Sequence, residues 1–201
     1  MISVYKIKPY FQKSLMPILE ALHKKKITAN QITVFAILFS IVLAILFWYA
    51  DHYHFFFLLL PIGLLIRMAL NALDGMMARL YNQTSKKGEL LNEVGDIISD
   101  FILFIPLLKF QAESLYLIVL FIGLSIINEF AGLMGKVLGG ERRYDGPMGK
   151  SDRALILGIY GLLMYFNVSI TGISLYVFII INALLLLSTL TRCRKALQNA
   201  Q

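Results

Sequence analysis

The chain has 201 residues, of which 58% are hydrophobic and 15% are charged, and its mean hydropathy is +0.72. A soluble domain is about half apolar and a quarter charged, so this composition indicates a membrane protein. The single cysteine, Cys193, excludes an internal disulfide framework and a cysteine-based metal site. The net charge of +7 does not indicate nucleic acid binding, because the basic residues border apolar runs.

Residues 1–30 are expected to form a juxtamembrane segment. Apolar residues recur in it at roughly helical spacing, which predicts an amphipathic helix on the membrane surface. The first apolar run begins only near Ile32, which is too late for a cleaved signal peptide. The run is also too long for one. Thr28 or Asn30 can cap the helix that follows. The lysines of this segment are Lys6, Lys8, Lys13 and the run Lys24–Lys26.

The rest of the chain predicts an all-α integral membrane domain with six transmembrane helices over residues 31–190, followed by a cytoplasmic tail, 191–201. The expected spans are 31–50, 54–81, 88–108, 114–138, 152–167 and 170–190. The fifth span is short, so the fifth and sixth spans could also be joined in a different way. Of the 19 Lys and Arg residues, Lys109 falls on the outer side and Arg67 within the membrane, and the others lie on the inner side. This distribution places both termini in the cytoplasm and the protein in the cell (inner) membrane.

The most informative stretch runs from Asn71 to Asp100, at the junction of the second and third spans. Charged and amide side chains recur there at helical spacing, within or beside segments expected in lipid, where charge is costly and usually functional. One face of the second span carries Arg67, Asn71, Asp74 and Ala78. One face of the third span carries Glu89, Glu93, Asp96 and Asp100, with Asn92 at its edge.

A short connection makes these two helices antiparallel neighbours. Their inner ends are therefore expected to bring oxygen-bearing side chains together near the cytoplasmic surface. Such oxygen clusters suit hard cations such as Mg²⁺ or Mn²⁺, and small residues beside them leave space for a diphosphate. The expected cluster contains Asn71, Asp74, Asn92 and Asp96.

The spacing of these residues resembles the motif of the CDP-alcohol phosphotransferase family, D-x2-D-G-x2-A-R-x8-G-x3-D-x3-D. In this chain Asp74-Gly75-x2-Ala78-Arg79, eight residues, Gly88, three residues, Asn92, three residues and Asp96 follow the motif with every gap intact. Asn71 and Asn92 stand at the first and third Asp positions. The resemblance extends to the juxtamembrane helix, to Ile27–Thr33 before the first span, and to a basic inner loop between spans four and five.

The resemblance implies an enzyme that transfers a substituted phosphate group from a CDP-linked lipid, such as CDP-diacylglycerol, to the hydroxyl of a small polar acceptor and releases CMP. In the family, the motif carboxylates bind two divalent ions, Mg²⁺ or Mn²⁺, and the last Asp deprotonates the acceptor. Carried over, the catalytic residue is Asp96 and the metal set is Asp74, Asp96, Asn71 and Asn92. The residues for the CDP moiety are Gly75, Ala78, Arg79 and Gly88. The resemblance also suggests a homodimer.

The two asparagines leave alternatives open. Asp74 and Asp96 carry two negative charges, whereas four Asp would balance two divalent ions. The site could hold one ion, bind two weakly, recruit Glu93 or Asp100, or retain binding without catalysis. A second register, Asn92-x3-Asp96-x3-Asp100, makes Asp100 the last Asp, but it needs four more residues after Arg79. The alternative function is a CDP-lipid-binding protein or a partner of another synthase; a transporter has less support, because the sequence shows no pair of broken helices.

Two further groups of charges complete the expectations. Arg67 and Glu129 lie within predicted spans and are expected to pair with polar partners in the bundle interior; an alternative is that Arg67 replaces part of a second cation. The inner loop Gly139–Arg153 supplies cations that suit phosphate, which predicts an anionic acceptor as an alternative to a neutral one. These acceptor-binding residues are Arg142, Arg143, Lys150 and Arg153.

Overall fold

The computed structural model describes residues 8–198, and the secondary structure within this range is helical throughout, as predicted. The first seven residues of the predicted N-terminal segment, with Lys6, and the last three residues of the predicted tail lie outside this range. The helices are α1 (Lys8–Lys24), α2 (Ala29–Trp48), α3 (Phe56–Leu80), α4 (Lys86–Phe104), α5 (Pro106–Phe110), η2 (Ala112–Ser114), α6 (Leu115–Val137), α7 (Lys150–Tyr165) and α8 (Ser174–Gln198).

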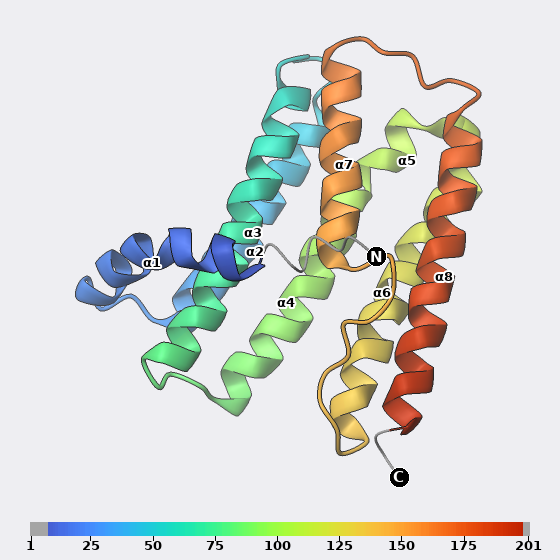
Figure 1. Cartoon of the computed structure of the whole chain (residues 1–201). Helices are drawn as coiled ribbons and strands as arrows, with labels where there is room; N and C mark the ends of the chain where they lie inside the picture. The colour runs from blue at the N-terminus through green and yellow to red at the C-terminus, as the bar shows by residue number, and fades with distance from the viewer. Residues whose placement is uncertain (1–7, 199–201) are drawn as a thin grey trace.

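Each of the six predicted spans overlaps one helix of at least 16 residues, and these helices run alongside one another (Figure 1). Four segments are long and apolar enough to cross a membrane: α2, α3, residues 112–137 and α8. Helix α7 has only 16 residues, and α4 carries four carboxylates and two lysines within its 19 residues. By length and composition the structure therefore defines a multi-pass membrane protein with four candidate spans. Helix α4 differs from these four in its charged composition, and helix α7 differs in its shorter length.

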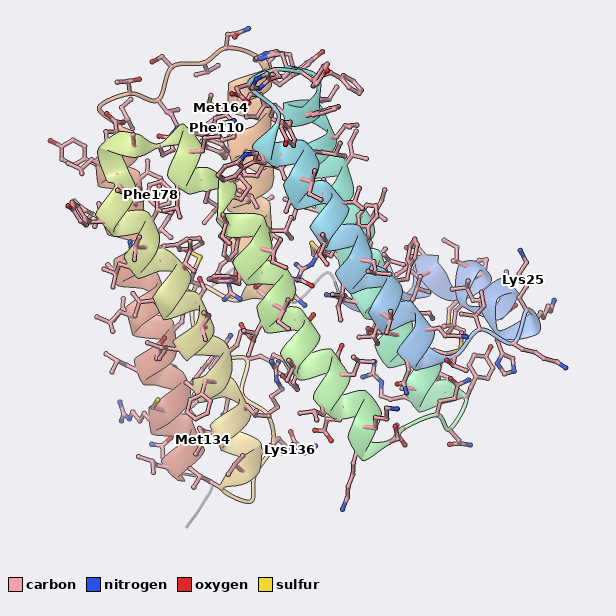
Figure 2. The ribbon with its side chains drawn as sticks, turned by 180° about the vertical axis from the view of Figure 1, so that it is seen from behind. Lys25, Phe110, Met134, Lys136, Met164 and Phe178 are labelled. Carbon is pink, nitrogen blue, oxygen red and sulfur yellow. The ribbon has the colours of Figure 1, made fainter. Side chains whose placement is uncertain are left out.

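The packing divides the bundle into two groups of helices. Helix α2 contacts α3 and α4, α3 contacts α7, and α6 contacts α8. A large apolar core joins the groups, with Phe47, Leu60, Phe121 and Leu185 among its buried members. Phe110, Met164 and Phe178 lie at one end of the bundle, and Met134 and Lys136 lie at the other (Figure 2). We call this second end, where α3 also passes into α4, the motif end.

Helix α1 lies beside the second half of α3, at a steep angle to the bundle, and projects to one side (Figure 1). Its buried residues Leu15 and Leu19 join Leu73, Met76 and Met77 of α3 in a second apolar cluster. Leu15 and Leu19 are four residues apart and therefore share one helical face. The predicted amphipathic segment is thus a helix whose apolar face packs, at least in part, against α3.

The start of α2 is held by a capping box, and the predicted cap at Thr28 is confirmed. The Thr28 hydroxyl accepts from the Gln31 amide at 3.3 Å, and the Gln31 side chain accepts from the Thr28 amide at 2.9 Å. The side-chain oxygen of Gln83, in the loop between α3 and α4, accepts from the Ala29 amide at 2.8 Å. These contacts fix the start of α2 beside the α3–α4 turn.

Three helix bounds differ from the predicted spans by four residues or more. Helix α4 ends at Phe104 instead of 108 because Pro106, which has no amide hydrogen, begins the short helix α5. Helix α8 begins at Ser174 instead of 170, after Gly172 with φ +76°, and continues to Gln198. Most of the predicted tail therefore belongs to the last helix.

Candidate active site

The two halves of the motif meet at the motif end of the bundle. Asn71 on α3 donates from Nδ2 to Oδ1 of Asp96 on α4 at 3.1 Å. Both side chains are half-buried, so the contact is still reached from solvent. Asn92 lies one turn before Asp96 on the same helix and is also half-buried. The structure thus brings together the Asn71 and Asp96 side chains, which the sequence placed on different helices.

Asp74 is held from a third helix. Its side chain is buried, and Oδ2 accepts a hydrogen bond from the Thr33 hydroxyl of α2 at 3.0 Å. The same hydroxyl lies 3.1 Å from the Ala29 carbonyl, one turn earlier in α2. The Thr33 hydroxyl thus lies between the Ala29 carbonyl and Asp74, and it orients the Asp74 carboxylate. Hydrogen-bond partners of metal-binding carboxylates orient their ligands in the same way. Helix α2 therefore contributes to the candidate site.

The motif glycines lie where side chains of other residues approach closely. An added Cβ at Gly75 would stand 3.6 Å from the guanidinium of Arg79, so this guanidinium lies beside Gly75. An added Cβ at Gly88 would come within 2.6 Å of Oδ1 of Asn30, at the start of α2. Ala78 lies on α3, one residue before Arg79, and is half-buried. The predicted residues for the CDP moiety therefore border the α2–α3–α4 end of the bundle.

Asp100, an alternative metal ligand from the sequence, has both carboxylate oxygens paired with arginines. Oδ1 lies 2.7 Å from Nη2 of Arg67 on α3, and Oδ2 lies 2.7 Å from Nη2 of Arg153 on α7. All three side chains are buried. Charge pairs of this kind need good geometry to compensate for the loss of hydration. The position of Asp100 is that of a structural ion pair between three helices.

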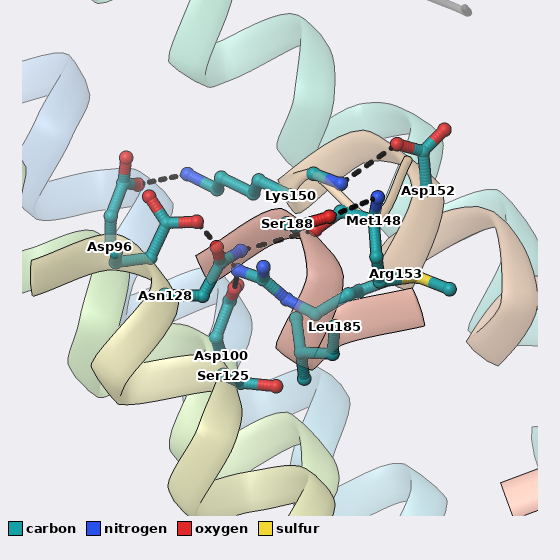
Figure 3. A network of polar contacts seen from close by, with 12 residues as sticks. Asp96, Asp100, Ser125, Asn128, Met148, Lys150, Asp152, Arg153, Leu185 and Ser188 are labelled. Atoms are coloured by element: carbon teal, nitrogen blue, oxygen red, sulfur yellow. Dashed lines mark hydrogen bonds and ion pairs between the residues drawn. The ribbon is translucent and has the colours of Figure 1, made fainter. Parts of the chain in front are cut away.

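Glu129 of α6 is the second acidic centre of the interior. It accepts from Arg153 at 3.0 Å, from Arg192 of α8 at 3.4 Å and from Arg142 at 2.9 Å. Through Arg153 it joins Asp100, and Figure 3 shows Asp100 and Arg153 in this network. We name Arg67, Asp100, Glu129, Arg153 and Arg192 the buried ion-pair network. The expectation that Arg67 and Glu129 pair inside the bundle is confirmed.

Glu93, the other alternative ligand, is paired at the edge of this network. Its Oε2 lies 2.8 Å from Nη2 of Arg142, which also contacts Glu129. Burial by itself would lower the pKa of the Arg142 guanidinium, but Glu129, Tyr144 and Glu93 raise it above its usual range. The loop arginine Arg142 is therefore a fixed cation that joins α4 to α6.

The loop between α6 and α7 packs against both α6 and α8. An added Cβ at Gly135 would come within 2.6 Å of Arg143 Cγ, and the Arg143 amide donates to the Gly132 carbonyl at 2.9 Å. Further along, Ser188 of α8 accepts from the buried Met148 amide at 2.8 Å. The small residues of α6 thus make room for the loop, which returns the chain to the start of α7.

The predicted acceptor-binding residues separate into three environments. Arg153 is buried in the ion-pair network, and Arg143 pairs with Asp145 at 3.0 Å. Burial alone would raise the pKa of Asp145, but Lys195 and Arg143 hold it below its usual range. Lys150, the first residue of α7, forms an ion pair with Oδ1 of Asp96 (Figure 3). Of these four cations, Lys150 is the one that contacts a motif carboxylate.

The donor set at the motif end fits a hard divalent cation. Within residues 8–198, no three His, Cys, Asp or Glu side chains are grouped as metal ligands. The candidate ligands are instead two carboxylates and two amide oxygens, all of the oxygen type that Mg²⁺ and Mn²⁺ prefer. The Lys150 ammonium beside Asp96 shows that this carboxylate already faces a cation. Asp74 and Asp96 are the charged members of the set.

Sequence reasoning missed two residues that shape this site. Thr33 bonds to Asp74, and Asn30 fills the space beside Gly88. Both belong to Ile27–Thr33, the segment that resembled the family before the first span. That resemblance was a signal that this segment matters, but nothing in it indicated which side chains reach the motif.

The fold and the site together define an all-helical, multi-pass membrane protein with an oxygen-rich polar site at one end of its bundle. Residues 26–190 match the family described as CDP-alcohol phosphatidyltransferase. The chain belongs to this family and is an enzyme of this class, whose members use divalent metal ions.

Two relatives show how far the similarity extends in sequence. The chain is 43% identical to "Inner membrane protein YnbA" of Escherichia coli (strain K12) over 195 residues, which cover 97% of this chain and 96% of that protein. It is 33% identical to an "Uncharacterized protein" of Aquifex aeolicus (strain VF5) over 95 residues, which cover 47% of this chain and 46% of that protein. The first similarity therefore extends over nearly the whole of both chains.

Solved structures share the fold. The phosphatidylinositol phosphate synthase PgsA1 of Mycobacterium tuberculosis with CDP-DAG bound superimposes with a TM-score of 0.70, at 19% identity, over 92% of each chain. The apo form of the same synthase gives a TM-score of 0.67, at 20% identity, over 91% of this chain and 94% of that chain. At these identities the similarity establishes the common helical architecture.

Proposed function

We propose that this enzyme transfers a phosphatidyl group from CDP-diacylglycerol, or a closely related CDP-linked lipid, to the hydroxyl of a small polar acceptor and releases CMP. The observation that carries the proposal is the contact between Asn71 and Asp96, which joins the two halves of the family motif across helices α3 and α4. The family membership supports the reaction class, and the CDP-DAG named for the similar PgsA1 structure supports the donor.

Asp96 is the proposed general base. Its Oδ1 already accepts from Asn71 and Lys150, and within the described part of the chain no hydrogen bond or ion pair occupies Oδ2. We propose that Oδ2 takes the proton of the acceptor hydroxyl. The acceptor oxygen then forms a bond to the phosphorus of the phosphatidyl group, and the bond from that phosphorus to the bridging oxygen of CMP breaks. CMP leaves with that oxygen and its electron pair.

The metal ligands are proposed to be Asp74 and Asp96, with the amide oxygens of Asn71 and Asn92. A bound Mg²⁺ or Mn²⁺ would neutralise the diphosphate and stabilise the charge of the departing phosphate. The role of Thr33 is to hold Asp74 in one orientation through its 3.0 Å hydrogen bond. Asp100 is left out of this set because Arg67 and Arg153 pair with both of its oxygens.

The donor's cytidine end is proposed to lie near Gly75, Ala78, Arg79 and Gly88, where small residues allow close approach. The apolar part of the lipid also has a candidate location. Between α7 and α8 lies a cavity of about 120 Å³ whose lining is apolar apart from Arg153, Tyr160 and Ser174. A cavity of this character suits part of an acyl chain better than a polar acceptor.

The proposed membrane arrangement rests on the distribution of basic residues. We propose six spans formed by α2, α3, α4 with α5, α6, α7 and α8, with the motif end and both termini on the cytoplasmic side of the inner membrane. Helix α1, which lies at a steep angle to the spans beside the second half of α3, would then lie at the membrane surface. Cysteine labelling from either side of intact cells, at loop residues 51–54 and 139–146, tests this orientation. A homodimer is proposed from the family resemblance, and cross-linking in native membranes is its test.

The acceptor is proposed to be small and polar, and the sequence leaves both a phosphorylated and a neutral one open. In the structure, the candidate arginines are already paired with carboxylates, so an anionic acceptor would have to displace such a partner. Arg143 is the best residue for testing acceptor binding, because it is paired with Asp145 and lies outside the buried ion-pair network. The variant Arg143→Ala should raise KM for an anionic acceptor more than for a neutral one. Equal changes for both would remove Arg143 from acceptor selection.

The direct experiment measures CMP release by the purified enzyme in liposomes that contain CDP-diacylglycerol, with Mg²⁺ or Mn²⁺ and a panel of acceptors. The variant Asp96→Asn should release CMP at least about 100-fold more slowly, because it cannot accept the proton. A matched control is Glu89→Gln, an exposed acid on the same helix that pairs with Lys136. Wild-type binding of CDP-lipid without CMP release for any acceptor would favour a non-catalytic CDP-lipid-binding protein or a partner of another synthase.

A further inference from the structure

We propose that Lys150 is a built-in cation of the site, whose ammonium group takes the place of one of the two divalent ions that the family resemblance implies. This inference deepens the proposed function and rests on its metal-assisted reaction. It states that the chain uses one divalent ion where the four-Asp motif serves two. The lysine contributes the second positive centre.

The charge of the motif is the first reason. The four-Asp form of the motif carries four negative charges, which balance two divalent ions. Asn71 and Asn92 remove two of these charges, so Asp74 and Asp96 retain two. Two divalent ions would then leave the site with an excess of positive charge in a partly buried place, where such an excess is costly. With one divalent ion and the Lys150 ammonium, the positive excess over the two carboxylates is one charge, whereas with two divalent ions and the ammonium it would be three.

The position of Lys150 is the second reason. Its Nζ forms an ion pair with Oδ1 of Asp96, and the same oxygen accepts from Asn71. The ammonium thus lies next to both the last motif Asp and the first altered position. Its side chain is 25% exposed and that of Asp96 is 18% exposed, so the pair is only partly hydrated. The fold therefore places a lysine ammonium directly beside Asp96.

The structure also fixes where this lysine begins. Lys150 is the first residue of α7, and the preceding Gly149 amide donates to the Asp152 carboxylate at 2.8 Å. One turn later, the buried Arg153 anchors the helix to Asp100 and Glu129. The backbone at Lys150 is therefore held on both sides, while its four-carbon side chain reaches Asp96. Such a lysine acts as a point charge at a defined place.

Arg67 does not fill this role, although the sequence made it the natural alternative. Its side chain is 3% exposed and is paired with Asp100 at 2.7 Å, within the buried ion-pair network. Asp100 is one turn beyond Asp96 and has Arg153 as its second partner. The cation that reaches the motif comes instead from the start of α7, which is distant in sequence from α3 and α4.

The test counts bound Mn²⁺ in the purified full-length protein by electron paramagnetic resonance, in nanodiscs without substrate. Wild type should bind one Mn²⁺ per chain. The variant Lys150→Gln should bind Mn²⁺ about tenfold more tightly, because a nearby like charge is removed. The triple variant Asn71→Asp/Asn92→Asp/Lys150→Gln should bind two. Lys150→Arg keeps the charge and should keep the wild-type stoichiometry and affinity.

The matched control is Lys109→Gln, which removes a lysine paired with Asp51 at the opposite end of the bundle. It should leave Mn²⁺ binding unchanged. Two Mn²⁺ per wild-type chain, or unchanged affinity in Lys150→Gln, would overturn the inference. If Lys150→Gln instead raised KM for an anionic acceptor alone, with Mn²⁺ binding unchanged, Lys150 would be an acceptor-binding residue. Failure to release CMP would refute the proposed reaction but not the metal count, so the two failures are distinguishable.

Discussion

Asp96 and Asp100 lie one turn apart on α4, yet they serve different parts of the molecule. Asp96 contacts Asn71 and Lys150 at the half-buried edge of the motif, whereas Asp100 is 6% exposed and is paired with Arg67 and Arg153. A carboxylate with both oxygens held by buried arginines stabilises the bundle. A carboxylate with an oxygen left for a ligand or a proton is available for chemistry. This difference leads to the first prediction.

Asp100→Asn should destabilise the fold, because it leaves Arg67 and Arg153 buried with one charged partner fewer. We expect a loss of about 3–5 kcal/mol in the free energy of unfolding, measured by denaturant titration in micelles. Asp96→Asn should change this free energy by less than about 1 kcal/mol, because its ion pair is partly exposed. If Asp100→Asn kept wild-type stability and lost CMP release, Asp100 would belong to the active site and the second motif register would be correct.

Thr33→Val should weaken metal binding while keeping the shape of the side chain. The variant removes the hydroxyl that donates to Asp74 at 3.0 Å, so the carboxylate loses its fixed orientation. We expect Mn²⁺ to bind about 10-fold more weakly in an equilibrium titration. Ser40→Ala is the control, because Ser40 is buried in the same helix and its hydroxyl donates to the Ala36 carbonyl. Equal effects of the two variants would show that Thr33 acts on helix α2 alone.

Gly88→Ala should raise KM for the CDP-lipid, because the added Cβ takes space proposed for the CDP moiety. It should also lower the melting temperature, because that Cβ would come within 2.6 Å of Asn30 Oδ1. A small displacement at the motif can cost about 100-fold in rate, so an increase of 10-fold or more is expected. Gly123→Ala is the control, since its Cβ would meet nothing within 4 Å. The double variant Asn30→Ala/Gly88→Ala should restore the melting temperature without restoring KM. Full recovery of KM would show that Gly88 only makes room for Asn30.

Asp51 should make stability depend on pH at the end of the bundle opposite the motif. Hydrogen bonds from Lys109 and His52 lower the pKa of this carboxyl to about 2, from a usual value of 3.8. Because the folded pKa is the lower one, the stabilisation is fully present above pH 3.8 and is lost as the pH falls through about 2. The difference in melting temperature between wild type and Asp51→Asn should therefore shrink from pH 5 to pH 2. A difference that stayed constant would show that the carboxylate contributes nothing.

Local sequence patterns predicted the helices well, because helix formation and capping depend on residues that are close in the chain. The apolar runs predicted the helices, and Thr28 was one of the two predicted caps of the first span. The capping box that Thr28 forms with Gln31 is local, since its residues are three apart. The bounds of α4 were missed at one end because Pro106 starts a new helix inside an otherwise apolar run. The start of α8 was missed because its preceding turn depends on Gly172 at positive φ.

The motif was likewise visible in the sequence, since the spacing from Asn71 to Asp96 is a property of two helices and one short connection. What the spacing could not indicate was the partner of each charge. Asp100 and Asp96 have the same residue type and share a helical face, and only the positions of Arg153 and Lys150 at the start of α7 separate their roles. The loop that packs against Gly135 could not be predicted from the sequence either.

The sequence by itself therefore determined the membrane class, the helices, and a motif in which Asn71 and Asn92 replace two acids. The tertiary structure alone decided that Thr33 orients Asp74, that Arg67 is committed to Asp100, and that Lys150 faces Asp96. The physical reason is that helical periodicity fixes which side chains share a face. The pairing of buried charges depends instead on long-range packing between helices.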